Sequence, residues 1–164
     1  MSVINAIRYA RLALQNWGTT EGISVGFKNL RDPLTLESED EKVILRVATN
    51  RSAEERNGQR RIMLVFEFHC LAKRGDLRDD GRTDRAEVLA SMIEKEFLHK
   101  DIDVYDAAAL ESTDRVKIGS LQFLESRWRN GDTRGTIYQD GVDYTLEQPK
   151  NEHWVVSMTA ALNA

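Results

Sequence analysis

The sequence is poor in the residues that mark secreted, membrane and metal-binding proteins. Its 164 residues include one cysteine, two prolines and three histidines. A lone cysteine cannot form an internal disulfide, and Cys70 lies in an apolar pattern, so we expect a buried, unreactive thiol and a reducing cytoplasm. No apolar run approaches the roughly 20 residues that span a bilayer. Arg8 and Arg11 interrupt the N-terminal apolar segment, which excludes a signal-peptide core. We therefore expect no membrane partner.

An excess of positive charge is also missing. The net charge is -4 and the isoelectric point is about 5.5, whereas dedicated binders of nucleic acid or anionic membranes usually carry a basic face. The hydrophobic and charged fractions, 41% and 30%, are those of an ordinary globular protein. With no linker and no internal repeat, residues 1–164 are predicted to form a single domain.

The clearest pattern is a strict alternation from Ile62 to Leu71, which predicts a β-strand with one wholly apolar face. The opposite face is mixed and carries Glu67 and His69, which could meet water or a partner. Residues from Asp84 to His99 then repeat apolar side chains at helical spacing, with a capping box at the start and a basic end. Such a helix needs a sheet to cover, and the preceding strand supplies it.

The rest of the chain reads as further strands and one more helix. A first helix is predicted from Ser2 to about Asn16, with Gly18 as its stop. Ile102 to Leu110 looks irregular. Strands are predicted at 23–27, 43–47, 116–128, 133–138, 142–146 and 153–162, with a bulge where the phase changes near Gly119 and Leu124, and with hairpins at Asn130-Gly131 and Asp140-Gly141. This order predicts an α+β fold with a mostly antiparallel sheet and two main helices packed on one side.

A long charged hairpin is predicted at about residues 50–61. Its charged residues that could contact another subunit are Arg51, Glu54, Glu55, Arg56 and Arg60. A solvated loop explains this composition as well as an arm that contacts a neighbouring molecule does. The composition is compatible with both interpretations.

A second candidate interface surrounds Trp128, which lies between Arg127 and Arg129, with Arg134 beyond the Asn130-Gly131 turn. Tryptophan and arginine are favoured at the centres of protein interfaces. A surface for stacking nucleic-acid bases is an alternative. A tryptophan that anchors its own core beneath a charged hairpin is favoured over both.

The sequence offers little catalytic chemistry. His69, His99 and His153 are predicted on a strand, a helix end and a turn, and none has a second histidine or cysteine at ligand spacing, so no metal and no cofactor are predicted. No nucleophile motif or phosphate-binding loop occurs. Glu67 and His69 could act as an acid–base pair, but two polar positions on a half-exposed strand need no such explanation. The chain is therefore predicted not to be an enzyme.

The order of elements resembles the tail terminator, or tail completion, proteins of long-tailed bacteriophages. The matching features are the helix that ends at Trp17, the strand Ile62 to Leu71, the helix Ala86 to Leu98 with its following Ile-Asp-Val segment, and the final strand His153 to Leu162. The resemblance covers nearly the whole chain but rests on element order and not on a motif. The long hairpin and the Asp140-Gly141 hairpin depart from smaller members of the family.

The resemblance implies a structural subunit of the virion that assembles in the host cytoplasm as a ring, usually a hexamer. Such a ring would sit at the head-proximal end of the tail, stop polymerisation of the tail tube and form the head–tail joining surface. Its implied partners are further copies of itself, the tail tube protein and the head-completion or connector protein. DNA would pass through the lumen without specific binding. The alternatives are another neck or tail protein, a small enzyme that uses Glu67 and His69, and a nucleic-acid adaptor that uses Arg127, Arg129 and Arg134.

Overall fold

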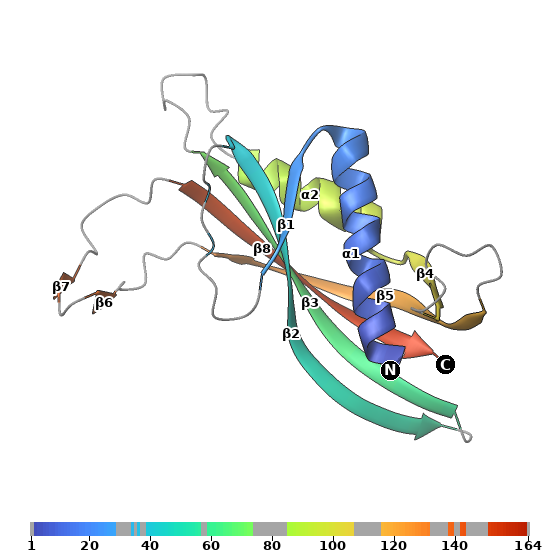
Figure 1. The fold of residues 1–164 in the computed structure, drawn as a ribbon. Coiled ribbons are helices and arrows are strands. Elements are labelled where there is room, and N and C mark those ends of the chain that lie inside the picture. Colours follow the sequence, from blue (N-terminus) through green and yellow to red (C-terminus); the bar gives the residue numbers. More distant parts are fainter. Residues whose placement is uncertain are drawn as a thin grey trace.

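The structure is a computed structural model that describes residues 2–28, 34, 36, 39–56, 59–73, 85–106, 116–131, 138–139, 142–143 and 151–163. The elements up to residue 97 are α1 (Ser2–Glu21), β1 (Ser24–Phe27), β2 (Glu41–Arg56), β3 (Gln59–Lys73) and α2 (Arg85–Phe97). The later elements are β4 (Asp101–Tyr105), β5 (Lys117–Asn130), β6 (Tyr138–Gln139), β7 (Val142–Asp143) and β8 (Asn151–Asn163). Figure 1 shows these elements in colours that follow the chain.

In the described part of the chain, six strands form one sheet in the order β1-β2-β3-β8-β5-β4. Only the β1–β2 pair is parallel, and the other four pairs are antiparallel. The last strand in sequence, β8, lies in the middle of the sheet between β3 and β5. The last described strand along the chain is therefore a central strand of the sheet, not an edge strand.

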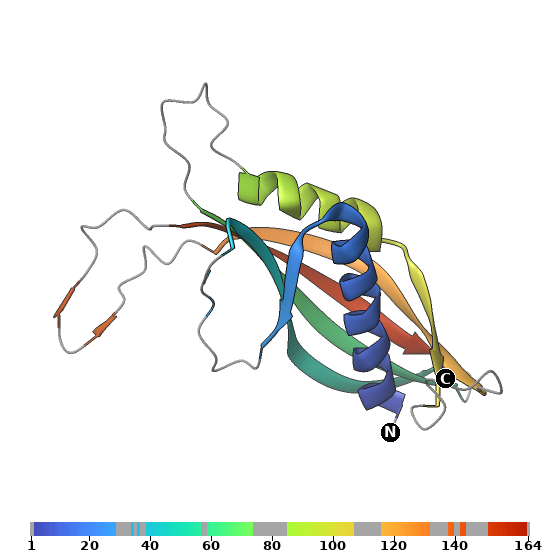
Figure 2. The same cartoon turned by 45° about the horizontal axis from the view of Figure 1, so that its top comes forward.

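Both described helices pack on the same face of the sheet, as Figures 1 and 2 show. Helix α2 lies over β3 and β8, whereas α1 contacts the two edge strands β1 and β4. One apolar cluster joins both helices to the sheet and includes Leu14, Leu89 and Ile93. The predicted α+β fold, with a mostly antiparallel sheet and two helices on one side, is confirmed.

The alternation predicted for the central strand is also confirmed. On the helix-covered face of β3, Leu64, Phe66, Phe68 and Cys70 are completely buried. Four phenylalanine rings from three elements form the centre of this layer, with centroids 4.9 to 6.3 Å apart: Phe66, Phe68, Phe97 and Phe123. Tilted contacts of this kind add to the burial of apolar area. Burial raises the pKa of the Cys70 thiol, which keeps it protonated.

The prediction that the first helix ends near Asn16 with Gly18 as its stop is wrong, because α1 continues to Glu21. Gly22 has a φ of 69°, and the Ile23 amide donates to the Gly18 carbonyl at 2.9 Å, which is a Schellman C-cap centred on Gly22. Gly18 serves another purpose. A Cβ there would lie 2.6 Å from Val25 Cγ1, so glycine allows β1 to pass close to the helix.

Two further predictions about the strands are corrected. Residues 50–56, predicted as part of a charged hairpin tip, instead continue β2, which pairs with β3 over this stretch. The segment from residue 101 to 105, largely predicted to be irregular, is the edge strand β4, in which Ile102 and Val104 are buried and the aspartates between them are exposed. The alternation in β4 covers only five residues, which is too short to identify a strand from the sequence.

The turn and bulge predictions in the second half have mixed outcomes. The register of β5 shifts between Phe123 and Glu125 against β8, which confirms a bulge at Leu124. Gln139 pairs with Val142, which confirms the hairpin at Asp140-Gly141. Of the strand predicted after Asn130-Gly131, only Tyr138 is described, and it pairs with β7. The remainder lies outside the described residues.

Candidate functional site

The first candidate interface lies on the hairpin formed by β2 and β3, whose outer part, residues 49–56 and 59–63, we call the arm. The backbone register places Glu55 opposite Arg60 and Glu54 opposite Arg61. Opposite charges at facing positions stabilise an antiparallel pair. Arg51 and Arg56 instead face Met63 and Gln59. The arm is thus a two-stranded element in whose register two arginines have no acidic residue directly opposite.

The second candidate interface is divided between the two faces of the sheet. Arg127 and Arg129 are exposed, whereas Trp128, between them, turns to the helix-covered face and packs with Trp154 at a centroid distance of 6.2 Å. Arg134 lies outside the described residues. Because neighbouring strand residues point to opposite faces, Trp128 and its two arginines do not form one continuous surface.

Trp128 is held by a contact with α2 that sequence reasoning missed. Its indole Nε1 donates to Glu94 Oε2, and the Ser126 hydroxyl donates to the same oxygen at 2.6 Å. Glu94 is only partly buried, so its charge retains some contact with water. This arrangement favours the interpretation in which Trp128 anchors its own core.

A polar cluster occupies the opposite face of the sheet, where neither helix packs. Glu67 Oε2 lies 2.8 Å from Arg129 and 3.2 Å from His69 Nε2. His69 Nδ1 lies 2.8 Å from Nε2 of His153 on β8. The last contact is a hydrogen bond, and it needs one hydrogen between the two nitrogens. Both rings therefore cannot be fully protonated while it persists.

Burial decides the charge of this cluster. His69 is only 3% exposed, although it was predicted on a face that could meet water. Desolvation, with added repulsion from His153, Arg46 and Arg129, lowers the pKa of His69 to about 3. The imidazole is therefore neutral at physiological pH. Its contact with Glu67 also lacks hydrogen-bond geometry.

These facts limit what the pair can do chemically. A general base works best when its pKa lies near the operating pH, and a buried imidazole with a pKa near 3 accepts protons weakly. Among the described residues, no group of three histidine, cysteine, aspartate or glutamate side chains is arranged to hold a metal. The arrangement suits a structural hydrogen-bond cluster better than an acid–base pair.

His153 joins the cluster because Gly131 leaves room for its ring. The Gly131 amide donates to the His153 carbonyl at 2.9 Å, and a Cβ on Gly131 would lie 2.7 Å from the imidazole. The sequence predicted a tight turn at this glycine, whereas its described contacts show that a glycine is needed there to let the His153 ring pack against the backbone. Nothing in the spacing of His69 and His153, 84 residues apart, indicated that the rings meet.

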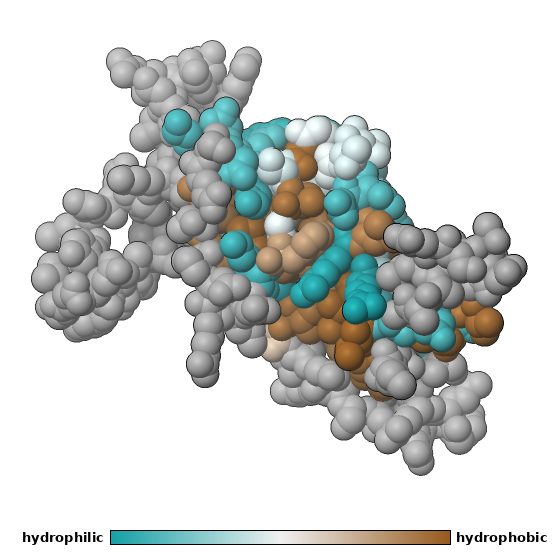
Figure 3. All heavy atoms as spheres, in the orientation of Figure 1, coloured by the Kyte–Doolittle hydropathy of each residue, from teal (hydrophilic) through white to brown (hydrophobic). Residues whose placement is uncertain are grey.

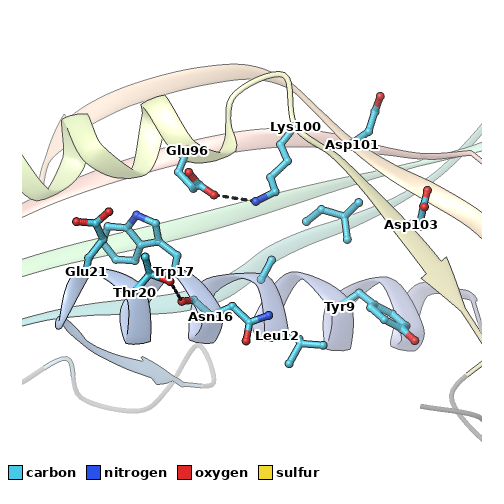
Figure 4. A pocket seen from close by; sticks show the side chains of 12 residues that line it. Tyr9, Leu12, Asn16, Trp17, Thr20, Glu21, Glu96, Lys100, Asp101 and Asp103 are labelled. Atoms are coloured by element: carbon cyan, nitrogen blue, oxygen red, sulfur yellow. Dashed lines mark hydrogen bonds and ion pairs between the residues drawn. The ribbon is translucent and has the colours of Figure 1, made fainter. Parts of the chain in front are cut away.

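A third feature is a groove of about 450 Å³ between α1 and the segment that leads from α2 into β4, shown in Figure 4. Tyr9, Leu12 and Trp17 supply apolar walls. Charged residues at the groove are Glu21, Glu96, Lys100, Asp101 and Asp103. Lys100 pairs with Glu96 at 2.8 Å, and Asp103 pairs with Lys117 at 2.8 Å. The groove is therefore amphipathic and predominantly acidic.

The comparisons with known proteins add no relative. No protein-family model matches the chain, and a search of curated proteins finds no match to it. Neither α1 nor α2, the helices that the structure describes, combines the length and apolar character needed to cross a membrane.

Proposed function

We propose that this chain is the subunit of a ring, of six copies as the family resemblance implies, that caps the head-proximal end of a long phage tail. In this role it would stop polymerisation of the tail tube and present the surface that joins the connector. The proposal includes the self-assembly, the tube and connector partners and the virion location that follow from the resemblance.

The observation that carries the proposal is the arm. Pairing between β1 and β2 ends at Leu45, yet β2 continues to Arg56 with β3 as its only strand partner among the described residues. Figure 1 shows this two-stranded element running out beyond the end of α1. A two-stranded arm that projects from the sheet suits a contact in which one surface meets a different surface on the next copy. Such heterologous contacts close into rings when the rotation permits.

Solution mass tests the proposal directly. Light scattering over a concentration series, with negative-stain images, is expected to find ring particles with a central hole, either in free solution or after addition of tail tubes. Tubes polymerised with the protein present should also be shorter and blunt-ended. A subunit that stays monomeric with tubes present, and leaves their length unchanged, overturns the proposal.

The contact between Glu67 and His69 is the observation behind the enzyme alternative. The low pKa and deep burial of His69 favour a structural role for this residue over a catalytic one. Glu67→Gln combined with His69→Gln separates the two: a ring subunit should still assemble and limit tube length, whereas an enzyme would lose turnover. The double change Arg127→Glu with Arg129→Glu tests the nucleic-acid adaptor alternative. An adaptor would bind nucleic acid more weakly after this change, and its binding would also weaken steeply as the salt concentration rises.

A further inference from the structure

We infer that the acidic groove between α1 and β4 receives the arm of a second copy of this chain. This inference rests on the proposed ring function and specifies the contact from which the ring is built. The occupant is the arm of the neighbouring copy, seated with its arginines toward the carboxylates of the groove.

The arm and the groove carry opposite net charges. By sequence, residues 49–61 contain four arginines and two glutamates, a net charge of +2. In the backbone register of the hairpin, Arg60 and Arg61 lie opposite glutamates, whereas Arg51 and Arg56 lie opposite Met63 and Gln59. The groove offers four carboxylates against one lysine. Within the described residues, neither Glu21 nor Asp101 forms an ion pair, although Asp101 interacts electrostatically with Lys117, which pairs with Asp103. Glu21 is therefore the carboxylate most available to a cation on another molecule.

Among the described residues, the outer edge of β2 has no strand partner and the groove exposes apolar surface. Beyond Leu45, none of the described strands pairs with the outer edge of β2. Exposed strand edges tend to be covered by another chain or protected by bulges, and β2 carries two register shifts there. The groove exposes apolar surface, because Leu12, which lines it, is 41% exposed. Figure 3 shows hydrophobic and hydrophilic residues interspersed on this face of the molecule.

The arm extends from one end of the long strands, whereas the groove lies along the side of α1, so the two surfaces occupy different places on the subunit. A contact between them is head-to-tail and uses one arm and one groove per copy. Repeated around an axis, it leaves no arm or groove unused in a closed ring.

A charge-reversal series tests the contact. Arg51→Glu with Arg56→Glu, or Glu21→Lys with Asp101→Lys, should each raise the dissociation constant for self-association at least ~10-fold, because like charges then face each other. Combining all four changes should restore association. Glu87→Lys, on an exposed part of α2, is the matched control and should leave association unchanged. Association that is unaffected by either double reversal overturns the inference.

A cysteine pair gives a second readout that does not depend on charge. Ser52→Cys on the arm and Leu12→Cys at the groove, in one chain, should form ladders of disulfide-linked copies on oxidation, while each single variant should not form ladders. The native Cys70 is buried and does not interfere. Ser52→Cys with Ser91→Cys on the exposed side of α2 is the matched control.

The two readouts together separate this inference from the proposed function. Rings without arm–groove disulfides overturn the inference alone. Disulfide ladders without rings or any effect on tubes support the contact and overturn the ring proposal. The absence of rings, tube effects and ladders overturns both.

Discussion

His69 on β3 and His153 on β8 form a hydrogen bond of 2.8 Å between Nδ1 and Nε2, across two strands whose direct pairs are His69 with Val155 and Leu71 with His153. The two rings are thus diagonal neighbours on one face of the sheet. Arg129 and Glu67 close the cluster from the sides. The bond requires that the rings share one hydrogen, which ties the stability of this face to pH.

Stability should fall as the pH falls below about 6.5, because the pKa of His69 is lowered to about 3 in the folded protein. Between these values the unfolded chain binds more protons than the folded one, so the stabilisation is complete above pH 6.5 and is lost toward pH 3. The slope contributed by one proton approaches ~1.4 kcal/mol per pH unit. Urea unfolding from pH 8 to pH 4.5 measures it.

His69→Gln should flatten this pH dependence, since glutamine does not titrate. His99→Asn is the control: His99 is exposed with a φ of 66°, a conformation that asparagine tolerates. An unchanged slope in His69→Gln would contradict the assignment of the pH dependence to this residue.

Gly131→Ala should destabilise the fold by about 1–3 kcal/mol, the usual range for overpacking. The added Cβ would lie 2.7 Å from the ring of His153, which also bonds His69. Thermal and urea unfolding measure the effect. Combining Gly131→Ala with His153→Ala should restore part of the loss relative to the sum of the single changes, and simple additivity would argue against the steric explanation.

Gly18→Ala should destabilise α1, although glycine-to-alanine changes inside helices usually stabilise by roughly 0.5–1 kcal/mol. The new Cβ would approach Val25 Cγ1 at 2.6 Å and the Ile23 carbonyl oxygen at 2.8 Å, and the backbone atom cannot move aside easily. The comparison is Thr20→Ala on the exposed side of the same helix, which should be close to neutral. Stabilisation by Gly18→Ala, measured by urea unfolding, would contradict this account.

Glu94→Ala should destabilise the protein by about 1–3 kcal/mol, because the Trp128 indole and the Ser126 hydroxyl lose their shared acceptor. Glu94→Gln keeps an acceptor oxygen and should lose less. Glu87→Ala, on the exposed surface of α2, is the control. Unfolding followed by tryptophan fluorescence gives both the stability and the environment of Trp128, and equal losses in Glu94→Ala and Glu87→Ala would show that the contact is dispensable.

The parts of the fold that follow from local pattern were predictable. Alternation over ten residues identified β3 and its buried face, and helical spacing identified α2, because both periods are set by backbone geometry within the element. The bulge at Leu124 was predictable for the same reason, because the alternation of apolar residues along the strand changes phase there. The edge strand β4 was missed because a five-residue alternation is too short to stand out from irregular sequence.

The candidate site was predicted less completely, since its contacts join residues distant in the chain. Glu67 and His69 were found on one strand face, but their partners His153, Arg129 and Gly131 are brought to them by β8 and by the end of β5. The arginines beside Trp128 looked like one surface in sequence, and the strand pleat divides them. Glu94, which holds Trp128, stood out only as one charge among several on a helix.

By itself, the sequence determined the types of element, their order and the apolar faces that become the core, because these depend on the spacing of side chains along the backbone. The tertiary structure alone decided that β8 lies between β3 and β5, that His69 is buried against His153, and that an acidic groove forms beside α1. Those outcomes depend on which strands pair and in which register, and pairing is set by the burial of all the apolar faces together.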